Sequence, residues 1–359
     1  MSQGTGNRSD SGANVTISDV ARRAGVSKGA VSFALNGRPG VSNGTRERIL
    51  RAAEELSWRP SVRARALSES RALAVGLILT CPPEHLASDP YVAHLLAGVE
   101  ASLATAGYAL VLIVVRDATS EAEAYRRLVR DGRIDGVLLT DPRIDDPRYA
   151  LVTELGLEAV VVGHPDPSVP LPAVAAVERD AIAHAMRALV DAGHERIAHV
   201  SGPRQLIHSA ERQSAWQEAL LELGLTPGKV ADGDFTAAGG ARATRRLLVR
   251  RPRPTAIFYA NDLMAISGVR AARELGVDVP RQLSVVGFDD IPLASHVHPR
   301  LTTIRQDPMA AGAAAASLLL ACLRGERPAA PVLPAAALEI RESIAPAPSG
   351  HSTSSRSRG

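Results

Sequence analysis

The 359-residue sequence predicts an all-α head followed by an α/β body of two doubly wound lobes, each built on a parallel sheet. Two different sequence patterns along the chain support this division. Residues 15–58 contain three short helical patterns and no strand-like run. From Leu73 onward, apolar runs typical of buried strands alternate with amphipathic stretches, as in parallel sheets covered by helices on both faces. About nine strands fit two lobes better than one sheet.

The first predicted helix covers residues 17–24. Thr16 and Asp19 form a capping-box pattern at its start, in which each side chain can bond the backbone of the other residue. Gly25 permits the left-handed turn that ends the helix. Local signals therefore define both ends of this element.

Two more helices complete the predicted head. Ser27 can cap a second helix over residues 28–36, and a third helix follows a Gly/Pro-containing loop over residues 42–56. Two short helices joined by a glycine turn and supported by a third form a helix-turn-helix arrangement. In such an arrangement, the second helix is the one that enters the major groove of DNA.

The body shows alternating strand and helix candidates. The strands are expected at residues 73–79, 110–115, 136–139, 159–162, 197–200, 255–260 and 283–288. The helices are expected at residues 92–106, 121–132, 181–192, 210–223, 238–250 and 263–274. Ligands of such folds bind at the carboxyl ends of the strands, so that edge is where a site is expected.

Composition places the domain boundaries. We expect a disordered arm over residues 1–14, the helical head over 15–59, a linker over 60–71, the body over 72–344 and a disordered tail over 345–359. The two lobes of the body are expected at residues 72–176 with 304–334, and at residues 177–303 with 335–344.

The overall composition is that of a soluble globular protein, with 45% hydrophobic and 22% charged residues. No apolar run reaches the ~20 residues of a membrane span, and the N-terminal residues lack the apolar segment of a secretory signal. Cys81 and Cys322 belong to no CxxC or Cys/His cluster, so neither a disulfide framework nor a metal site is expected. These features predict a cytoplasmic protein with no membrane partner.

The charge is unevenly distributed. Residues 1–72 hold twelve Lys or Arg against six Asp or Glu, whereas the remainder is mildly acidic within an overall net charge of +3. A basic head on an acidic body indicates that the head binds a polyanion.

The head resembles the DNA-binding domain of the LacI/GalR (lactose/galactose repressor) family of bacterial transcription regulators. The resemblance rests on the run from Thr16 to Asn36, and on Val41-Ser42, Thr45-Arg46-Glu47 and Trp58-Arg59-Pro60. It continues to about residue 340, so it covers nearly the whole chain.

By position, the resemblance implies that polar side chains of the head contact DNA, mainly at phosphates. These residues are Thr16, Ser27, Ser32, Asn36, Ser42 and Thr45. Lys28, Gly29 and Phe33 occupy the base-reading positions. The family commonly has Arg at the Phe33 position, and a phenyl ring can pack on a thymine methyl but cannot form paired hydrogen bonds with guanine. The alternatives are that Phe33 folds into the head's core, and that Ser27 and Ser42 are only helix caps.

Residues 61–67 resemble the family's hinge helix, which orders on operator DNA. By that resemblance, Leu67 wedges into the central minor groove, and Arg63 and Arg65 lie beside phosphates. The alternative is a solvated linker with incidental arginines.

The body resembles the periplasmic-binding-protein-like sensor of the same family. The matching segments are Asp89-Pro-Tyr91, Gly193-His-Glu-Arg-Ile197, Gly202-Pro203, Ala260-Asn-Asp262, Gly287-Phe-Asp-Asp290 and Leu301-Thr-Thr-Ile-Arg-Gln306. The resemblance implies that an effector is bound by Asp89, Tyr91, His164, His208, Arg212, Phe235, Asn261 and Asp289. Phe235 would stack on its apolar face. One departure is that Val177-Glu178 replaces the family's usual Asp-Asn pair.

This set of side chains suits a polyol. Carboxylates accept hydrogen bonds from neighbouring hydroxyls, guanidinium and amide groups donate to them, and an aromatic ring covers the C–H face of a sugar. Structural alternatives exist for several residues. Asp262 and Asp290 can be caps, and Arg212 can form a surface ion pair with Glu211 or Glu218.

The sequence therefore predicts a homodimeric repressor of carbohydrate-uptake or catabolism genes that binds a pseudo-palindromic operator and responds to a small sugar-like effector. A sugar-binding transport component would leave the basic head unexplained. An enzyme is disfavoured because the only nucleophile-like pattern, Gly25-Val-Ser-Lys-Gly29, lies between two helices rather than after a strand. His296 and His298 lack an evident third metal ligand, and no cofactor is expected.

Overall fold

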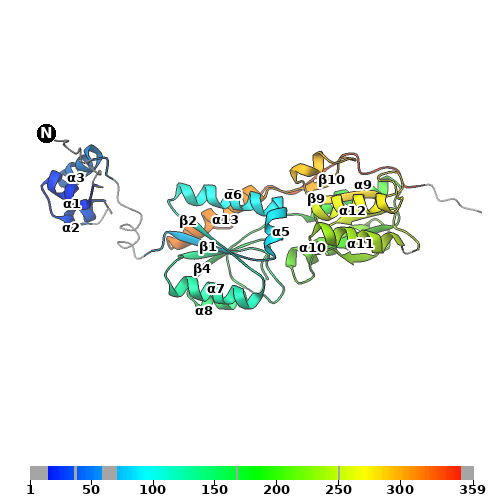
Figure 1. The fold of residues 1–359 in the computed structure, drawn as a ribbon, viewed down its shortest axis with the longest axis horizontal. Coiled ribbons are helices and arrows are strands. Elements are labelled where there is room, and N and C mark those ends of the chain that lie inside the picture. The colour runs from blue at the N-terminus through cyan, green and yellow to red at the C-terminus, as the bar shows by residue number, and fades with distance from the viewer. Residues whose placement is uncertain (1–14, 36–38, 59–70, 167–168, 250, 349–359) are drawn as a thin grey trace, which may run out of the picture. The chain divides into compact units, whose positions relative to one another are not determined.

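The computed structural model describes residues 15–35, 39–58, 71–166, 169–249 and 251–348 (Figure 1). The chain divides into two compact units, Met1–Arg71 and Ala72–Gly359. The expectations for Asn36, Arg63, Arg65 and Leu67, and for residues 1–14, lie outside the described residues.

The head consists of three helices, as predicted: α1 (Ile17–Ala24), α2 (Lys28–Leu35) and α3 (Asn43–Glu55). The capping box forms at α1, and Gly25 ends that helix with φ 66°. Ser27 Oγ accepts the backbone N–H of Ala30 at 3.1 Å. The helix boundaries thus follow the local signals in the sequence, because each signal satisfies backbone groups that the helix itself leaves unpaired.

One apolar cluster holds the three helices together. Its fully buried members come from all three helices and are Val20, Ala21, Ala24, Val31, Ala34, Ile49, Ala52 and Ala53. The small side chains allow the helices to approach closely, and Arg48 Nε adds a hydrogen bond of 3.2 Å to the Ala24 carbonyl. The head therefore has its own core, as a separate domain requires.

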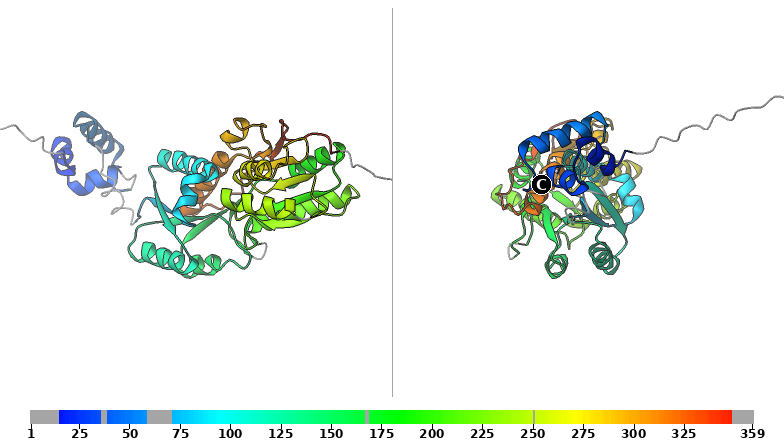
Figure 2. Two further views of the ribbon diagram at one scale, coloured as in Figure 1. Left: turned by 45° about the vertical axis from the view of Figure 1, so that its right-hand side comes forward. Right: turned by 90° about the vertical axis from the view of Figure 1, so that its left-hand side faces the viewer.

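The first lobe of the body is a five-stranded parallel sheet in the order β2-β1-β3-β4-β5. Its strands are β1 (Ala74–Thr80), β2 (Ala109–Val115), β3 (Gly136–Leu139), β4 (Glu158–Val162) and β5 (Ala173–Val174). One face is covered by α6 (Pro90–Thr105) and α13 (Pro308–Leu323), the other by α7 (Ala118–Arg130) and α8 (Arg148–Glu154), as Figures 1 and 2 show. The short α5 (Pro83–Ser88) follows β1.

The second lobe is a six-stranded sheet in the order β11-β10-β9-β8-β6-β7, parallel except for β11. Its strands are β6 (Ile197–Ser201), β7 (Val230–Asp232), β8 (Ala256–Tyr259), β9 (Ser284–Asp289), β10 (Thr302–Arg305) and β11 (Ala337–Glu339). Its helices are α9 (Arg179–Asp191), α10 (Ile207–Glu222), α11 (Ala237–Val249), α12 (Asp262–Glu274) and the 3-10 turn η1 (Pro292–Ser295). The first two cover one face, and α11 with α12 covers the other.

No helix in the described part of the chain is long and apolar enough to span a membrane.

All seven expected strands are present, within one or two residues of their predicted limits. The predicted elements did not include α13, the shorter helices α5 and α8, or the strands β5, β7, β10 and β11. Strands of two or three residues are too short to show an alternating pattern, and α13 is almost uniformly apolar, so it has no amphipathic stripe.

Two expected boundaries need correction. Ile304 and Arg305 pair with β9, so they belong to the second sheet, and the returning part of the first lobe begins later than residue 304. The tail also begins later than expected. The Ala345 carbonyl accepts a hydrogen bond from Ser284 Oγ at 3.2 Å, and the Ala347 N–H bonds the Ala192 carbonyl at 2.8 Å. These hydrogen bonds order a segment whose composition alone suggested disorder.

Close helix packing places α13 in the first lobe although it comes late in the chain. A Cβ atom at Gly98 of α6 would lie 2.0 Å from the Met309 carbonyl oxygen, and one at Gly312 of α13 would lie 2.3 Å from the Leu95 carbonyl oxygen. The two helices therefore touch backbone to backbone at reciprocal glycines. Larger side chains at either position would push the helices apart.

Candidate functional site

The exposed face of α2 brings together the predicted base-reading residues. Lys28, Gly29 and Phe33 are exposed and Ser32 is half-buried, whereas Val31 on the opposite side is fully buried. Residues spaced by one, four and five positions lie on one side of a helix, so these four residues form one continuous strip.

Phe33 lies outside the head's core. Its side chain is 42% exposed and does not belong to the apolar cluster of the head. The ring instead lies beside Gly40, where an added Cβ atom would be 3.4 Å from it. Of the two alternatives for Phe33, the structure therefore excludes burial in the core and leaves the ring available on the α2 strip.

Capping hydroxyls stand at the starts of the head's helices. Ser27 caps α2, and Ser42 caps α3 while donating a hydrogen bond of 2.9 Å to Thr45 Oγ1. Thr16 donates to the Asp19 carboxylate at 2.7 Å, and this hydrogen bond lowers the pKa of Asp19. A cap at an exposed helix N-terminus remains close to the positive end of the helix dipole, where an anionic phosphate is favoured. The capping role and a phosphate contact are thus compatible.

In the body, the predicted effector residues gather where the strands of both lobes end. Asp89 and Tyr91 begin α6 in the first lobe, and Arg212 on α10 and Asp289 at the end of β9 belong to the second. Burial raises the pKa of Tyr91, and the charges of Arg212 and Asp289 act on the same phenol. The charge of Asp89 acts in turn on Asp289. The two lobes therefore contribute to one polar site.

Arg212 is the most fully engaged residue of this site. Its Nε and Nη2 donate to the two carboxylate oxygens of Glu178 at 2.8 and 2.9 Å, and Nη1 donates to the Ala260 carbonyl at 2.9 Å. The guanidinium carbon lies 3.7 Å from the centre of the Phe288 ring. The side chain is only 7% exposed.

The surface ion pair considered for Arg212 is therefore wrong. Glu211 pairs with His164 and Glu218 with Arg179, so neither acid is its partner. Arg212 projects inward from α10 because it lies on the buried side of that helix, whereas Glu211 is exposed.

An aromatic platform forms the second feature of the site. The rings of His208 and Phe235 stack with centroids 5.3 Å apart and an interplanar angle of 15°. Burial and the charge of Arg212 together lower the pKa of His208 to about 3, so the imidazole is neutral near pH 7. A Cβ atom at Gly202 would lie 2.2 Å from the Phe235 ring, so the glycine after β6 is required for this placement.

Asn261, rather than Asp262, caps α12. Asn261 Oδ1 accepts the Met264 N–H at 3.0 Å, and its Nδ2 donates to the Phe235 carbonyl at 3.0 Å. The predicted effector donor therefore also positions the backbone of the platform residue. Asp262 is fully buried, accepts a hydrogen bond from Thr303 Oγ1 at 2.6 Å, and has its pKa raised to about 7 by burial.

Asp289 and Asp290 have different partners. Asp289, at φ 110°, accepts a hydrogen bond of 2.6 Å from Gln306 Nε2, and burial raises its pKa well above the ordinary value. Asp290 forms an ion pair of 2.6 Å with Arg341 and does not cap a turn. Asp289 remains at the polar site, whereas Asp290 joins the η1 turn to the chain after β11.

Sequence reasoning missed two residues of the site. Glu178 appeared only as a departure from a family pattern, yet it is the partner of Arg212. Asp141 lies two residues after the end of β3, and its charge acts on Tyr91. The signal for Asp141 was available, because a polar residue just after a buried parallel strand lies at the ligand-binding edge of the sheet. No local signal pairs Glu178 with Arg212, which lies 34 residues away.

A loop of the first lobe also contacts the second lobe directly. Arg143 forms an antiparallel β-bridge with Leu206, and the Ile207 N–H donates to the Pro142 carbonyl at 2.9 Å. This contact lies immediately before α10, which carries His208 and Arg212. Relative movement of the lobes would therefore change this backbone pairing.

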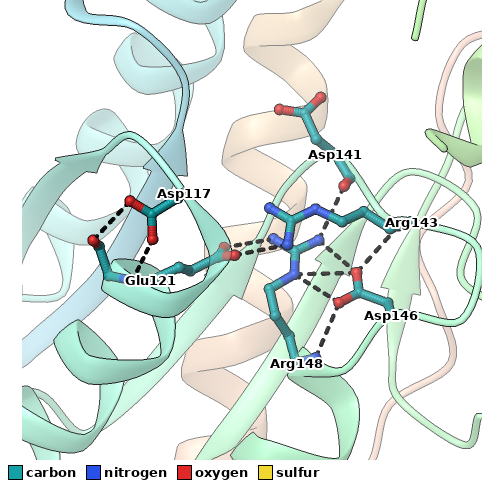
Figure 3. A network of polar contacts seen from close by, with 7 residues as sticks. Asp117, Glu121, Asp141, Arg143, Asp146 and Arg148 are labelled. Atoms are coloured by element: carbon teal, nitrogen blue, oxygen red, sulfur yellow. Dashed lines mark hydrogen bonds and ion pairs between the residues drawn. The ribbon is translucent and has the colours of Figure 1, made fainter. Parts of the chain in front are cut away.

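A buried charge network anchors that loop (Figure 3). Arg143 and Arg148 both pair with Glu121 of α7, at 2.7 and 3.3 Å, and Arg148 also pairs with Asp146 at 2.6 Å. Burial alone would raise the pKa of Asp146, but the hydrogen bonds and charge of Arg148 outweigh it and lower that pKa. Arg148 Nη2 also donates to the Asp141 carbonyl at 3.0 Å.

His164 and Glu211 form a second contact between the lobes, an ion pair. His164 Nδ1 lies 2.8 Å from a Glu211 carboxylate oxygen. This hydrogen bond raises the pKa of His164 above its ordinary 6.5, although burial opposes the shift. Because the pKa of His164 is raised in the folded protein, the stabilisation from this ion pair is fully present below pH 6.5 and is lost as the pH rises through the raised value.

We expect Glu211→Gln to lower the pKa of His164. The measurement is an NMR titration of the His164 ring protons in the parent protein and the variant. An unchanged titration midpoint would show that Glu211 does not hold the imidazolium.

The described residues contain no group of three or more His, Cys, Asp or Glu side chains placed to bind a metal ion. His296 Nδ1 lies 2.8 Å from the Pro292 carbonyl oxygen, so that ring has a local partner. Gly25 to Gly29 form the turn between α1 and α2 and the start of α2, which is not the strand-to-helix setting of a nucleophile elbow.

Known protein families match both the head and the body of the chain. Residues 16–61 match the family model described as bacterial regulatory proteins, lacI family, and residues 186–344 match the periplasmic binding protein-like domain. The HTH-type transcriptional regulator CelR of Thermobifida fusca is 36% identical over 87% of this chain and 92% of its own length. Catabolite control protein A of Priestia megaterium is 30% identical over 85% and 92%, respectively.

Solved structures show the same architecture. A CelR–cellobiose complex superposes with a TM-score of 0.71 at 34% identity, covering 92% of this chain and 99% of that one. The lac repressor dimer bound to operator and the anti-inducer ONPF gives a TM-score of 0.76 at 28% identity, covering 93% and 100%. The likeness extends through the head and both lobes.

Proposed function

The chain belongs to the lacI family of bacterial regulatory proteins, and from that premise we propose that it is a cytoplasmic repressor whose affinity for operator DNA is set by a small polyhydroxylated effector. The observation that carries the DNA-binding part is the exposed α2 strip of Lys28, Gly29, Ser32 and Phe33 on a separately folded, capped head. Base contacts from such a strip provide sequence selectivity, and cap hydroxyls with nearby basic residues bind the phosphates.

The effector part rests on the site between the lobes. Carboxylates at Asp89 and Asp289 can accept hydrogen bonds from hydroxyl groups, and the Phe235–His208 platform can cover the C–H face of a ring. CelR, a relative with the same architecture, has been solved with cellobiose. We propose a sugar or sugar derivative as the effector and carbohydrate-uptake or catabolism genes as the targets.

The proposed assembly is a homodimer. Two heads related by a two-fold axis would bind the halves of a pseudo-palindromic operator, as in the lac repressor dimer bound to operator. Residues 61–67, with Leu67 as the wedge into the minor groove, would complete the contact, although they lie outside the described residues. We propose no catalytic role for any residue.

The test is operator binding at several salt concentrations. We expect an operator selected from random DNA to bind at least a thousandfold more tightly than random duplex at the same salt, with both affinities falling steeply as salt increases. Equal affinity for the selected and random duplexes would contradict the proposal, because it would leave only sequence-independent phosphate binding.

The Phe33 ring is expected to pack against a thymine methyl group in the operator. Replacing the contacted thymine with uracil removes that methyl, and we expect the parent protein to lose about 0.8 kcal/mol, or about fourfold in Kd. Phe33→Ala should weaken binding to the thymine operator and show no further loss with uracil. If the parent binds every uracil-substituted operator as tightly as the original, the ring does not contact a thymine methyl.

A further inference from the structure

The hydrogen-bonding capacity of Arg212 is largely used within the protein itself. A guanidinium carries five N–H groups, and three of them already have acceptors: two carboxylate oxygens of Glu178 and the carbonyl of Ala260. The paired geometry with Glu178 is the same two-pronged arrangement by which arginine binds a ligand carboxylate or phosphate. Glu178 thus occupies the position on Arg212 that an anionic ligand would take.

Among the described residues, the hydrogen bonds of the Glu178 side chain all go to Arg212. It stands at the N-cap of α9, but its side chain makes no capping hydrogen bond. The carboxylate is instead turned toward α10 and is only 18% exposed. Burying a carboxylate is costly unless it is paired, so the two hydrogen bonds with Arg212 stabilise both charges together.

Apart from His164, which is paired with Glu211, the remaining charges at the site are acidic. The carboxyl groups of Asp89, Asp141, Glu178 and Asp289 act on Arg212 or on its neighbour Tyr91, either directly or through one another. Burial raises the pKa of Asp289, and its carboxyl group accepts a hydrogen bond of 2.6 Å from Gln306 Nε2. His208 adds no positive charge because its pKa is lowered to about 3.

From this arrangement we infer that the effector carries no negative charge, and that Glu178 is the residue that excludes anionic analogues by serving as the internal counter-ion of Arg212. The inference rests on the proposed effector site and specifies its ligand class. An incoming carboxylate or phosphate would have to displace Glu178 and would leave that carboxylate buried without a partner. A neutral polyol needs no such exchange.

The test compares matched neutral and anionic sugars. Binding of cellobiose and cellobionate, and of glucose and glucuronate, is measured by isothermal titration calorimetry with the parent protein, Glu178→Gln and Glu218→Gln. Glu218→Gln is the control, because it makes the same change to the half-exposed carboxylate that pairs with Arg179 on the same helix pair.

The parent protein and the control should bind the neutral member of a pair at least tenfold more tightly than its carboxylate. Glu178→Gln removes the carboxylate that pairs with Nε and Nη2 of Arg212. We therefore expect the preference for the neutral sugar over its carboxylate to fall by at least tenfold in this variant. If the parent binds both members equally, or if Glu178→Gln retains the parent's preference, the inference is wrong while the proposed function stands.

A second measurement does not depend on choosing the right sugar. Inorganic phosphate should raise the Tm of Glu178→Gln relative to the same ionic strength of chloride, with no such rise in the parent or the control. If no sugar binds and phosphate shifts all three proteins alike, the inference fails. If no sugar alters operator binding but phosphate stabilises only Glu178→Gln, the sugar-effector proposal fails and the role of Glu178 survives. Glu178→Asn serves as the variant if Glu178→Gln does not fold.

Discussion

Replacing Arg148 with methionine is expected to lower the free energy of unfolding by about 3–5 kcal/mol. The side chain of Arg148 is 4% exposed, and those of its partners Glu121 and Asp146 are 2% and 0% exposed. Methionine fills much of the same volume but leaves two carboxylates buried, with only the more exposed Arg143 to compensate Glu121. The cost arises from the unpaired charges, since the packing changes little.

The measurement is urea unfolding followed by circular dichroism. Arg130→Met is the matched control, because the pair of Arg130 with Asp131 is 72% and 43% exposed, and exposed pairs contribute only about 0–1 kcal/mol. A loss for Arg148→Met no greater than that of the control would contradict the assignment of a buried charge network.

The same network gives Arg148→Met a second expected consequence. Arg148 holds the carbonyl of Asp141, and the loop that follows carries the β-bridge from Arg143 to Leu206 in the other lobe. Loosening the loop would weaken a contact between the lobes just before α10. The network thus links stability of the first lobe to the geometry of the effector site.

Arg212→Ala is expected to abolish the effector response. Effector linkage of this kind typically changes affinity about 5–150-fold, and in the variant the ratio of operator affinities with and without effector should fall to about one. Arg212 joins Glu178 before α9, the carbonyl of Ala260 after β8 and the ring of Phe288 in β9. Its removal would therefore disorganise the second-lobe side of the site as well as delete a donor.

The measurement is operator titration by fluorescence anisotropy, with an effector identified by a thermal-shift screen of sugars and nucleosides. Arg204→Ala is the control. Arg204 lies close to α10 but is 74% exposed in its pair with Asp232, so that variant should retain the parent's response. A parent-like response in Arg212→Ala would remove Arg212 from the effector site.

Local interactions made much of this protein predictable from its sequence. The capping box at Thr16, the left-handed Gly25 and the Ser27 cap each satisfy backbone groups within a few residues, so the head's helices could be placed without a tertiary model. The alternation of apolar strands and amphipathic helices likewise predicted the parallel sheets. The polar residues after strands were found because the end of a strand is visible in the sequence.

Contacts between distant segments were decided only by the tertiary structure. The sequence placed Arg212 at the effector site but offered the wrong acids as its partners, because neighbours along a helix are visible and a residue on another helix is not. The fold also gave the α12 cap to Asn261, because Asp262 is buried against Thr303 and the Ile291 backbone, and it placed α13 in the first lobe through its glycine contact with α6. Sequence alone thus determined most of the helices and strands that form and where their polar ends lie. The pairing of buried charges depended on which side chains the folded chain brings face to face, since a charge removed from water must find its partner wherever the fold supplies one.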